Sequence, residues 1–165
     1  MELSRIETRQ AADEAITFVL DHDVFATPLT PGEIQVLRQD PYDSLEGQPS
    51  AYWFCRDAMD RMAALIGIRE HINHTGIYEM TCIAVSRALR QTGIGTRMLQ
   101  AALQYIRDTG GRGMLVDTSD HPAYEPMRKL LIRSGFTRVG HLPSFYYPGE
   151  GTLLYYRLLE PEGAL

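Results

Sequence analysis

The sequence predicts a single α/β domain in which a mixed sheet of about seven strands is flanked by about four helices. Three observations favour this fold class. Apolar residues recur at helical spacing in some segments, whereas in others they form short runs or alternate as in strands. Turn and capping residues separate these segments. Neither a repeat nor a low-complexity linker interrupts residues 1–165, so we expect one domain.

The first part of the chain holds a short strand and two helices. Residues 3–8 are predicted to form the strand, and residues 10–20 carry apolar side chains at helical spacing. Thr30-Pro31-Gly32-Glu33 has the pattern of a capping box with proline at the first helical position. A second helix is therefore predicted from there to about residue 39, where Asp40-Pro41 is expected to end it.

Strand-like runs dominate the middle of the chain. Residues 51–56, 62–70 and 77–85 are expected to form an antiparallel meander, because turn residues separate them. The later elements complete the order strand, helix, helix, three strands, helix, strand, helix and two strands. They are a helix at 93–107, a strand at 114–117, a helix at 125–134 and strands at 136–139 and 152–159.

Composition excludes several classes of protein. The chain has 165 residues, of which 44% are hydrophobic and 22% charged, as in a globular domain with a sizeable core. Its net charge of -5 argues against nucleic acid as the main partner. No apolar run reaches the roughly 20 residues that span a bilayer, and the N-terminus lacks a signal-peptide pattern, so we expect a cytoplasmic protein. Cys55 and Cys82 lie in apolar runs and are expected to be buried, reduced thiols.

The junction between the strand at 77–85 and the following helix carries the main functional motif. The strand ends near Val85, and Arg90-x-x-Gly93-x-Gly95 then opens the helix. Two glycines at a helix N-terminus let backbone N–H groups converge, and the helix dipole adds partial positive charge, so a pyrophosphate fits there. The loop is too long for a Rossmann turn and lacks its third glycine. A P-loop is also excluded, because no Gly-Lys-Ser/Thr follows.

This pattern resembles the acetyl-CoA-binding motif of the GNAT N-acetyltransferase superfamily, R/Q-x-x-G-x-G/A after a strand that ends in valine. The predicted element order is similar to the GNAT fold, a central twisted and mostly antiparallel sheet, so the resemblance covers most of the chain. It implies that acetyl-CoA is the co-substrate and that the strand residues Ile83, Ala84 and Val85 pair with the pantetheine arm. The residues that it places around the pyrophosphate, mainly through their main chain, are Arg90, Gln91, Thr92, Gly93, Ile94, Gly95 and Thr96.

The last third of the chain resembles a narrower group of uncharacterised GNAT acetyltransferases. The segment from Tyr124 to Phe136 is similar to that group's pattern Y-x-P-A-R-x-F-Y-x-x-x-G-F/Y, and residues 145–150 are similar to D-F-Y-x-P-G-D. One departure matters. Many family members have a tyrosine four residues before the Gly-Phe pair, and its phenol protonates the departing CoA thiolate. Leu131 stands there in this chain, so that phenol is missing.

Acetyl transfer to an amine needs a base, because a lysine-type amine has a pKa of about 10.4 and its deprotonation at pH 7 costs roughly 4–5 kcal/mol. Glu79 shares one face of its strand with Thr81, Ile83 and Val85 by period-2 alternation. By resemblance it stands where several family members carry a general-base glutamate. The alternative is a solvated or ion-paired glutamate at a strand entrance.

The general acid has two candidates, Tyr124 and Tyr146, and the thiolate can also leave unassisted because thiols have a pKa near 8.5. Asp117 is a secondary candidate for the base or for binding the acceptor. No metal is expected. His71-x-x-His74 has metal-like spacing but spans a turn and lacks nearby Cys or carboxylate partners, and Asp120-His121 is interpreted as a helix cap.

The expected function is acetyl transfer from acetyl-CoA to a primary amine by direct attack, without a covalent enzyme intermediate. A small molecule such as an amino acid or a polyamine is the favoured acceptor, and a protein N-terminus or lysine is the alternative. An alternative of another class is a regulatory domain that binds CoA without catalysing a reaction. This alternative is considered because Leu131 stands where the resemblance implies a tyrosine. No membrane partner is expected, and a homodimer through the late strands is possible for this fold.

Overall fold

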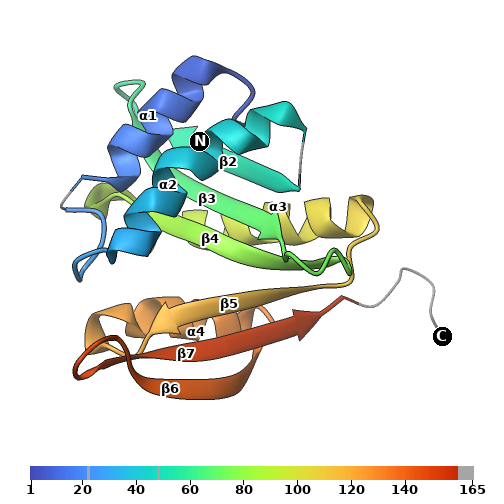
Figure 1. The fold of residues 1–165 in the computed structure, drawn as a ribbon. Coiled ribbons are helices and arrows are strands. Elements are labelled where there is room, and N and C mark those ends of the chain that lie inside the picture. Colours follow the sequence, from blue (N-terminus) through green and yellow to red (C-terminus); the bar gives the residue numbers. More distant parts are fainter. Residues whose placement is uncertain (22, 48, 160–165) are drawn as a thin grey trace. The chain divides into compact units, whose positions relative to one another are not determined.

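The computed structural model describes residues 1–21, 23–47 and 49–159. Within them, seven strands and four α-helices follow in the predicted order (Figure 1). Hydrogen bonding arranges the strands as β1-β2-β3-β4-β5-β7-β6 in one mixed, mostly antiparallel sheet. The fold class predicted from the sequence is thus confirmed.

Two compact units make up the chain, one formed by residues 1–70 and 81–102 and the other by residues 71–80 together with 103 onward. Strand β4 (Ile77–Val85) and helix α3 (Ile94–Asp108) each pass from one unit into the other. We describe each unit by itself. The expectation of one domain over residues 1–165 remains a prediction, and positions 22, 48 and 160–165 lie outside the described residues.

In the first unit, β1 (Ser4–Arg5) is shorter than the strand predicted at residues 3–8, because Thr8 caps α1 (Arg9–Val19) instead of extending the strand. The predicted capping box of α2 (Pro31–Asp43) is present: the Thr30 hydroxyl accepts from the Glu33 N–H and the Glu33 carboxylate accepts from the Thr30 N–H. No helix of the described residues combines the length and apolar character needed to cross a bilayer.

The predicted end of α2 before Pro41 is wrong. The helix includes Pro41, runs to Asp43, and continues as a 3-10 turn at Ser44–Glu46. A proline lacks an N–H and its ring crowds the carbonyl of the preceding turn, but Pro41 lies in the last turn of α2, where little of the helix follows it. The residue before the proline, Asp40, is also held in place by tertiary hydrogen bonds to β2.

Strands β2 (Ser50–Arg56) and β3 (Met62–Glu70) pair antiparallel, as predicted. α1 and α2 lie against one face of these strands (Figure 1), and side chains such as Val19, Leu37 and Leu65 form the core between them. Both cysteines are free and buried, which confirms that expectation.

In the second unit, β5 (Gly113–Ser119) pairs antiparallel with β7 (Glu150–Leu158), and β7 pairs antiparallel with β6 (Thr137–Tyr147). Helix α4 (Glu125–Arg133) belongs to the same unit. The first residues of β4 pair with β5 in parallel, from Ile77–Gly113 to Glu79–Leu115. This pairing places Glu79 beside a central strand of the unit.

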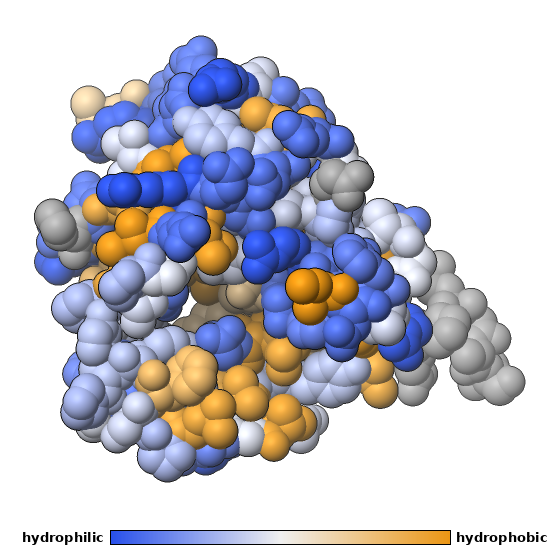
Figure 2. All heavy atoms as spheres, viewed as in Figure 1, coloured by the Kyte–Doolittle hydropathy of each residue, from blue (hydrophilic) through white to orange (hydrophobic). Residues whose placement is uncertain are grey.

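Strand β6 is longer than the sequence predicted. We expected a strand only at 136–139, but the strand runs to Tyr147 and includes part of the segment 145–150. Gly140, Pro143 and Ser144 interrupt the strand pattern, and β6 accommodates them with two shifts of register against β7. Most of its side chains are exposed, and apolar residues gather over β6 and β7 in the lower part of Figure 2.

Candidate active site

The loop from β4 to α3 carries the glycine motif of the sequence. After Val85 come a 3-10 turn at Arg87–Leu89 and two residues with positive φ, Gln91 at 63° and Gly93 at 85°. The Thr92 hydroxyl donates to the Leu89 carbonyl at 2.6 Å and closes the loop. α3 starts at Ile94, and the first N–H groups of a helix have no partners within it.

The start of α3 is uncrowded at Gly93. A Cβ added at Gly93 would meet nothing within 4 Å, so no protein atom crowds the start of α3 at this position. The side chain of Ile94, the first residue of α3, is buried. The N–H groups of a helix's first turn and the helix dipole suit a negatively charged group.

Arg90 stabilises the loop with its side chain. Its Nε donates to the Val85 carbonyl at 3.2 Å, and its Nη2 donates to the Val24 carbonyl at 3.1 Å. The guanidinium therefore joins the end of β4 to the segment between α1 and α2. The role of residues 90–96 in binding a phosphate stays a prediction.

Burial alternates along β4, as the predicted period requires. Glu79, Thr81, Ile83 and Val85 are half-buried, and the residues between them are buried. Glu79 is the β4 residue of the last register pair with β5, and residues 83–85 follow that pair along β4.

Glu79 has an ion-pair partner that the sequence did not indicate. The Nε2 atom of His71 lies 3.6 Å from Oε1 of Glu79, and the two side chains are 31% and 34% exposed. The backbone N–H of His71 donates to the Ile77 carbonyl at 2.7 Å, which places the two side chains at the same end of β4. The statement that His71 lacks a nearby carboxylate was wrong. Among the described residues, no three His, Cys, Asp or Glu side chains gather as a metal site would require.

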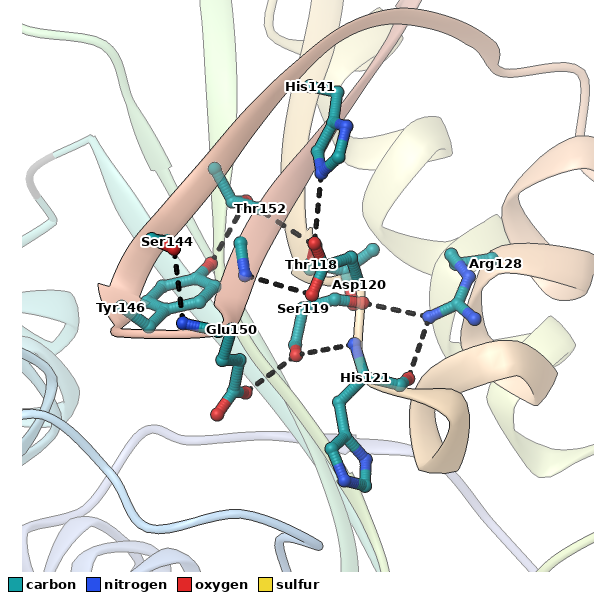
Figure 3. A network of polar contacts seen from close by, with 12 residues as sticks. Thr118, Ser119, Asp120, His121, Arg128, His141, Ser144, Tyr146, Glu150 and Thr152 are labelled. Carbon is teal, nitrogen blue, oxygen red and sulfur yellow. Dashed lines mark hydrogen bonds and ion pairs between the residues drawn. The ribbon is translucent and has the colours of Figure 1, made fainter.

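Two other predicted site residues are in direct contact. The phenol of Tyr146 donates to the carboxylate of Asp117 at 2.7 Å. The same phenol lies 3.2 Å from the Thr152 hydroxyl (Figure 3). Asp117 is exposed near the end of β5, and Tyr146 belongs to β6. The phenolic proton is therefore directed at a carboxylate, which makes it less available for transfer to a leaving thiolate.

Tyr124 ends a 3-10 turn at Pro122–Tyr124, directly before α4, and is half-buried. Leu131, at the position where the sequence resemblance implies a tyrosine, is fully buried. The N–H of Phe136 donates to its carbonyl at 3.0 Å, so this turn of α4 serves packing and helix termination.

A polar network joins the end of β5 to the β6–β7 hairpin (Figure 3). The carboxylate of Asp120 contacts Nε2 of His141 at 2.9 Å and accepts from the Gly151 N–H at 2.8 Å. The hydrogen bond from His141 is the main cause that lowers the pKa of Asp120. The hydroxyl of Ser119 donates to Glu150 at 2.6 Å.

The interpretation of Asp120-His121 as a cap is half right. Nδ1 of His121 accepts from the Ala123 N–H at 3.2 Å and caps the turn before α4, whereas Asp120 pairs with the distant His141. The contact of Asp120 with His141 could not be predicted from sequence spacing. The two residues are brought together only by the register of β6 against its neighbouring strand.

Comparison with known proteins agrees with this architecture. A family model described as "Acetyltransferase (GNAT) family" matches residues 19–136, which end just before β6. The fold is similar to the crystal structure of a GNAT-family acetyltransferase from Desulfovibrio desulfuricans, with a TM-score of 0.80 and 25% identity over 95% of this chain and 98% of that chain. No curated protein matches the chain by sequence.

Two further structures share the fold at lower identity. One is a streptothricin acetyltransferase from Bacillus anthracis in complex with acetyl coenzyme A, with a TM-score of 0.63 and 16% identity over 72% of this chain and 68% of that chain. The other is the ribosomal-protein-S18-alanine N-acetyltransferase from Escherichia coli, with a TM-score of 0.71 and 12% identity over 99% of both chains.

Proposed function

Because this chain belongs to the acetyltransferase (GNAT) family, we propose that it transfers the acetyl group of acetyl-CoA to a primary amine by direct attack on the thioester. The observation that carries the proposal is the junction of β4 and α3, where a positive-φ loop leads into an uncrowded helix N-terminus. No covalent enzyme intermediate is required, since the amine itself is the nucleophile.

The coenzyme is proposed to bind along β4 and the loop that follows it. Backbone N–H groups of residues 90–96 hold the pyrophosphate, and the dipole of α3 favours its negative charge. The main chain of residues 83–85 pairs with the amides of the pantetheine arm like an added strand. Acetyl-CoA bound to the Bacillus anthracis relative supports the choice of this donor.

Glu79 is proposed as the general base. The amine must lose a proton, at a cost of roughly 4–5 kcal/mol at pH 7, before or during its attack. A half-buried carboxylate on the same strand as residues 83–85 can accept that proton directly or through a water molecule. His71 at 3.6 Å positions the carboxylate, and it also supports the alternative of a structural ion pair.

Departure of the thiolate is proposed to need little help from the protein. Leu131 is buried where the resemblance implies a tyrosine, and the phenol of Tyr146 is bonded to Asp117. Tyr124 remains the candidate acid. A thiol with a pKa near 8.5 is also an acceptable leaving group without protonation.

A small-molecule amine is the favoured acceptor, as for the streptothricin acetyltransferase among the relatives. The exposed Asp117 and the half-buried Glu150, both in the second unit, suit a cationic acceptor. A protein N-terminus is the alternative acceptor, which the similarity to the S18-alanine N-acetyltransferase supports. We also propose that, if a homodimer forms, a second copy packs on the exposed apolar side chains Val139, Leu142 and Phe145 of β6.

The test is CoA thiol release from acetyl-CoA with a panel of amino acids, polyamines, aminoglycosides and short peptides. Glu79→Gln should lower kcat by about 100-fold or more while the Kd of acetyl-CoA stays unchanged. Glu125→Gln is the matched control, because it removes the carboxylate of an exposed ion pair with Lys129 in the same unit.

Three outcomes separate the alternatives. Release with one class of amine identifies the acceptor. Wild-type turnover in Glu79→Gln contradicts the proposed base. Binding of acetyl-CoA by calorimetry without release from any amine would favour the regulatory domain over the enzyme.

A further inference from the structure

Asp40 is a buried carboxylate for which the proposed mechanism has no use. It is 1% exposed and lies near the end of α2. The hydroxyl of Ser50 donates to its Oδ1 at 2.9 Å, the phenol of Tyr52 donates to its Oδ2 at 2.7 Å, and Nη1 of Arg69 lies 3.6 Å away. Burial of a charge is costly unless it is paired and hydrogen-bonded, so the surrounding residues are arranged around this carboxylate.

Tyr52 connects Asp40 to β4. Its ring lies beside Gly67 of β3, its cross-strand partner, and its hydroxyl is 2.8 Å from Oγ1 of Thr81. A Cβ on Gly67 would lie 2.2 Å from two ring atoms of Tyr52 and 2.5 Å from Oγ1 of Thr81. The absence of a side chain at Gly67 is therefore what allows the phenol to reach Thr81.

The donor and the acceptor in each hydrogen bond between Thr81, Tyr52 and Asp40 follow from how many protons each group can donate. A carboxylate only accepts, and a phenol has one proton to donate. Since Tyr52 donates to Asp40, its oxygen can only accept from Thr81. Burial raises the pKa of Tyr52 well above its ordinary value, with the charge of Asp40 as a further cause, which keeps that proton on the phenol.

The hydroxyl proton of Thr81 is thus used within the protein, and its oxygen presents lone pairs. The thiol of Cys82 lies beside it, but a thiol is a weak donor and takes at most one of the two lone pairs. Successive hydrogen bonds that point the same way polarise one another and make the terminal oxygen a better acceptor. Thr81 is half-buried and belongs to the same alternating set on β4 as Glu79.

We propose that Oγ1 of Thr81 accepts a hydrogen bond from an N–H of the acceptor amine, with Tyr52 and Asp40 as positioning residues that fix the direction of the threonine hydroxyl. The inference rests on the proposed acetyl transfer, because it names a binding group for that reaction's amine. An amine or ammonium is chosen because it offers N–H donors, which an oriented hydroxyl oxygen can bind. The pantetheine amides are instead assigned to the main chain of residues 83–85.

The test measures KM for the amine and for acetyl-CoA, together with Tm, in three variants. Thr81→Val keeps the branched shape and removes the oxygen, and we expect about a tenfold rise in KM for the amine with KM for acetyl-CoA unchanged. Thr81→Ser keeps the hydroxyl and should remain within about twofold of the wild type for both substrates. Tyr52→Phe removes the bond that directs the hydroxyl and should raise KM for the amine by a smaller factor, about threefold.

Two results would overturn the inference. One is Thr81→Val with the wild-type KM for the amine. The other is that Thr81→Val and Thr81→Ser show the same decrease in Tm and the same rise in KM for both the amine and acetyl-CoA. That result would indicate that Thr81 serves packing only. Failure of the proposed function looks different, because the wild-type protein would then acetylate no amine at all. A wild-type enzyme that is active, with an unaffected Thr81→Val variant, refutes this inference and leaves the acetyltransferase proposal intact.

Discussion

Replacement of Gly67 by alanine tests whether the close approach of Tyr52 to Thr81 is built into the fold. The added Cβ would lie 2.2 Å from Cε1 and Cζ of Tyr52. Ordinary contacts between carbon atoms are about 3.5–4.0 Å, so the ring would have to move by about 1.5 Å. Tyr52 is 1% exposed and bonded at its hydroxyl to both Asp40 and Thr81, so it cannot swing into solvent.

Overpacking of a buried site costs about 1–3 kcal/mol. The displaced phenol would also weaken its bond to the buried Asp40, so we expect Gly67→Ala to lose about 2–4 kcal/mol of unfolding free energy. For a chain of this size each 1 kcal/mol lowers Tm by about 2–4 °C, which predicts a decrease of about 4–16 °C.

The assay is urea unfolding followed by circular dichroism, together with a thermal melt. Gly32→Ala in α2 is the control, because a Cβ there meets nothing within 4 Å and alanine is the better helix former. The control should be neutral or slightly more stable than the wild type. A Gly67→Ala protein as stable as this control would refute the assignment of Gly67 as the space that Tyr52 needs.

Three other predictions follow from the loop, the hairpin network and the buried thiols. Gly93→Val should weaken acetyl-CoA binding at least tenfold, as measured by calorimetry. The φ of Gly93 is 85°, and a β-branched residue is strained in that conformation even though no neighbouring atom would clash with it. Gly93→Asn should lose less affinity, because asparagine tolerates positive φ. The lowered pKa of Asp120 means that its pairing with His141 stabilises the fold above the ordinary value of 3.8 and is lost as the pH falls through the lower folded value. Asp120→Asn should therefore be less stable than the wild type near pH 6 and approach it near pH 2, and equal differences at both pH values would contradict this pairing. Burial raises the pKa of Cys82 to about 12, so Ellman's reagent should react with it at pH 8 only after unfolding; fast labelling of the native protein would show that the thiol is accessible.

The order of elements was predictable because local signals were strong. The bounds of β3 and β4 agree with the sequence prediction, since turn residues stand at both ends of each apolar run. The errors occurred where tertiary contacts outweigh local preference. Pro41 was expected to end α2, yet bonds from Ser50 and Tyr52 hold the residue before it. The second half of β6 was not predicted, because Pro143 is untypical of a strand. The register shifts that accommodate it depend on the pairing with β7, which the sequence of one strand does not contain.

In the candidate site, too, local motifs were predictable from the sequence, whereas contacts between residues far apart in the sequence were not. The loop that includes Gly93 has a local motif, and its positive φ follows from the glycine. The contact of Tyr146 with Asp117 joins residues that the sequence singled out separately for different roles. The chain of hydrogen bonds from Thr81 to Asp40 crosses three elements, and none of its members lies close to another in sequence. Such contacts require the register of β2 on β3, which periodicity alone does not supply.

Both edges of the sheet are poor templates for a foreign strand. At one edge, β1 has only two residues, Ser4 and Arg5, too few to hold an added chain. At the other edge, β6 carries Pro143, which has no N–H to offer, and its two shifts of register break the regular row of backbone groups. The exposed apolar side chains of β6 are thus presented on a backbone that resists cross-β growth. Concentrated solutions of this protein should therefore be protected from fibril seeding at its sheet edges.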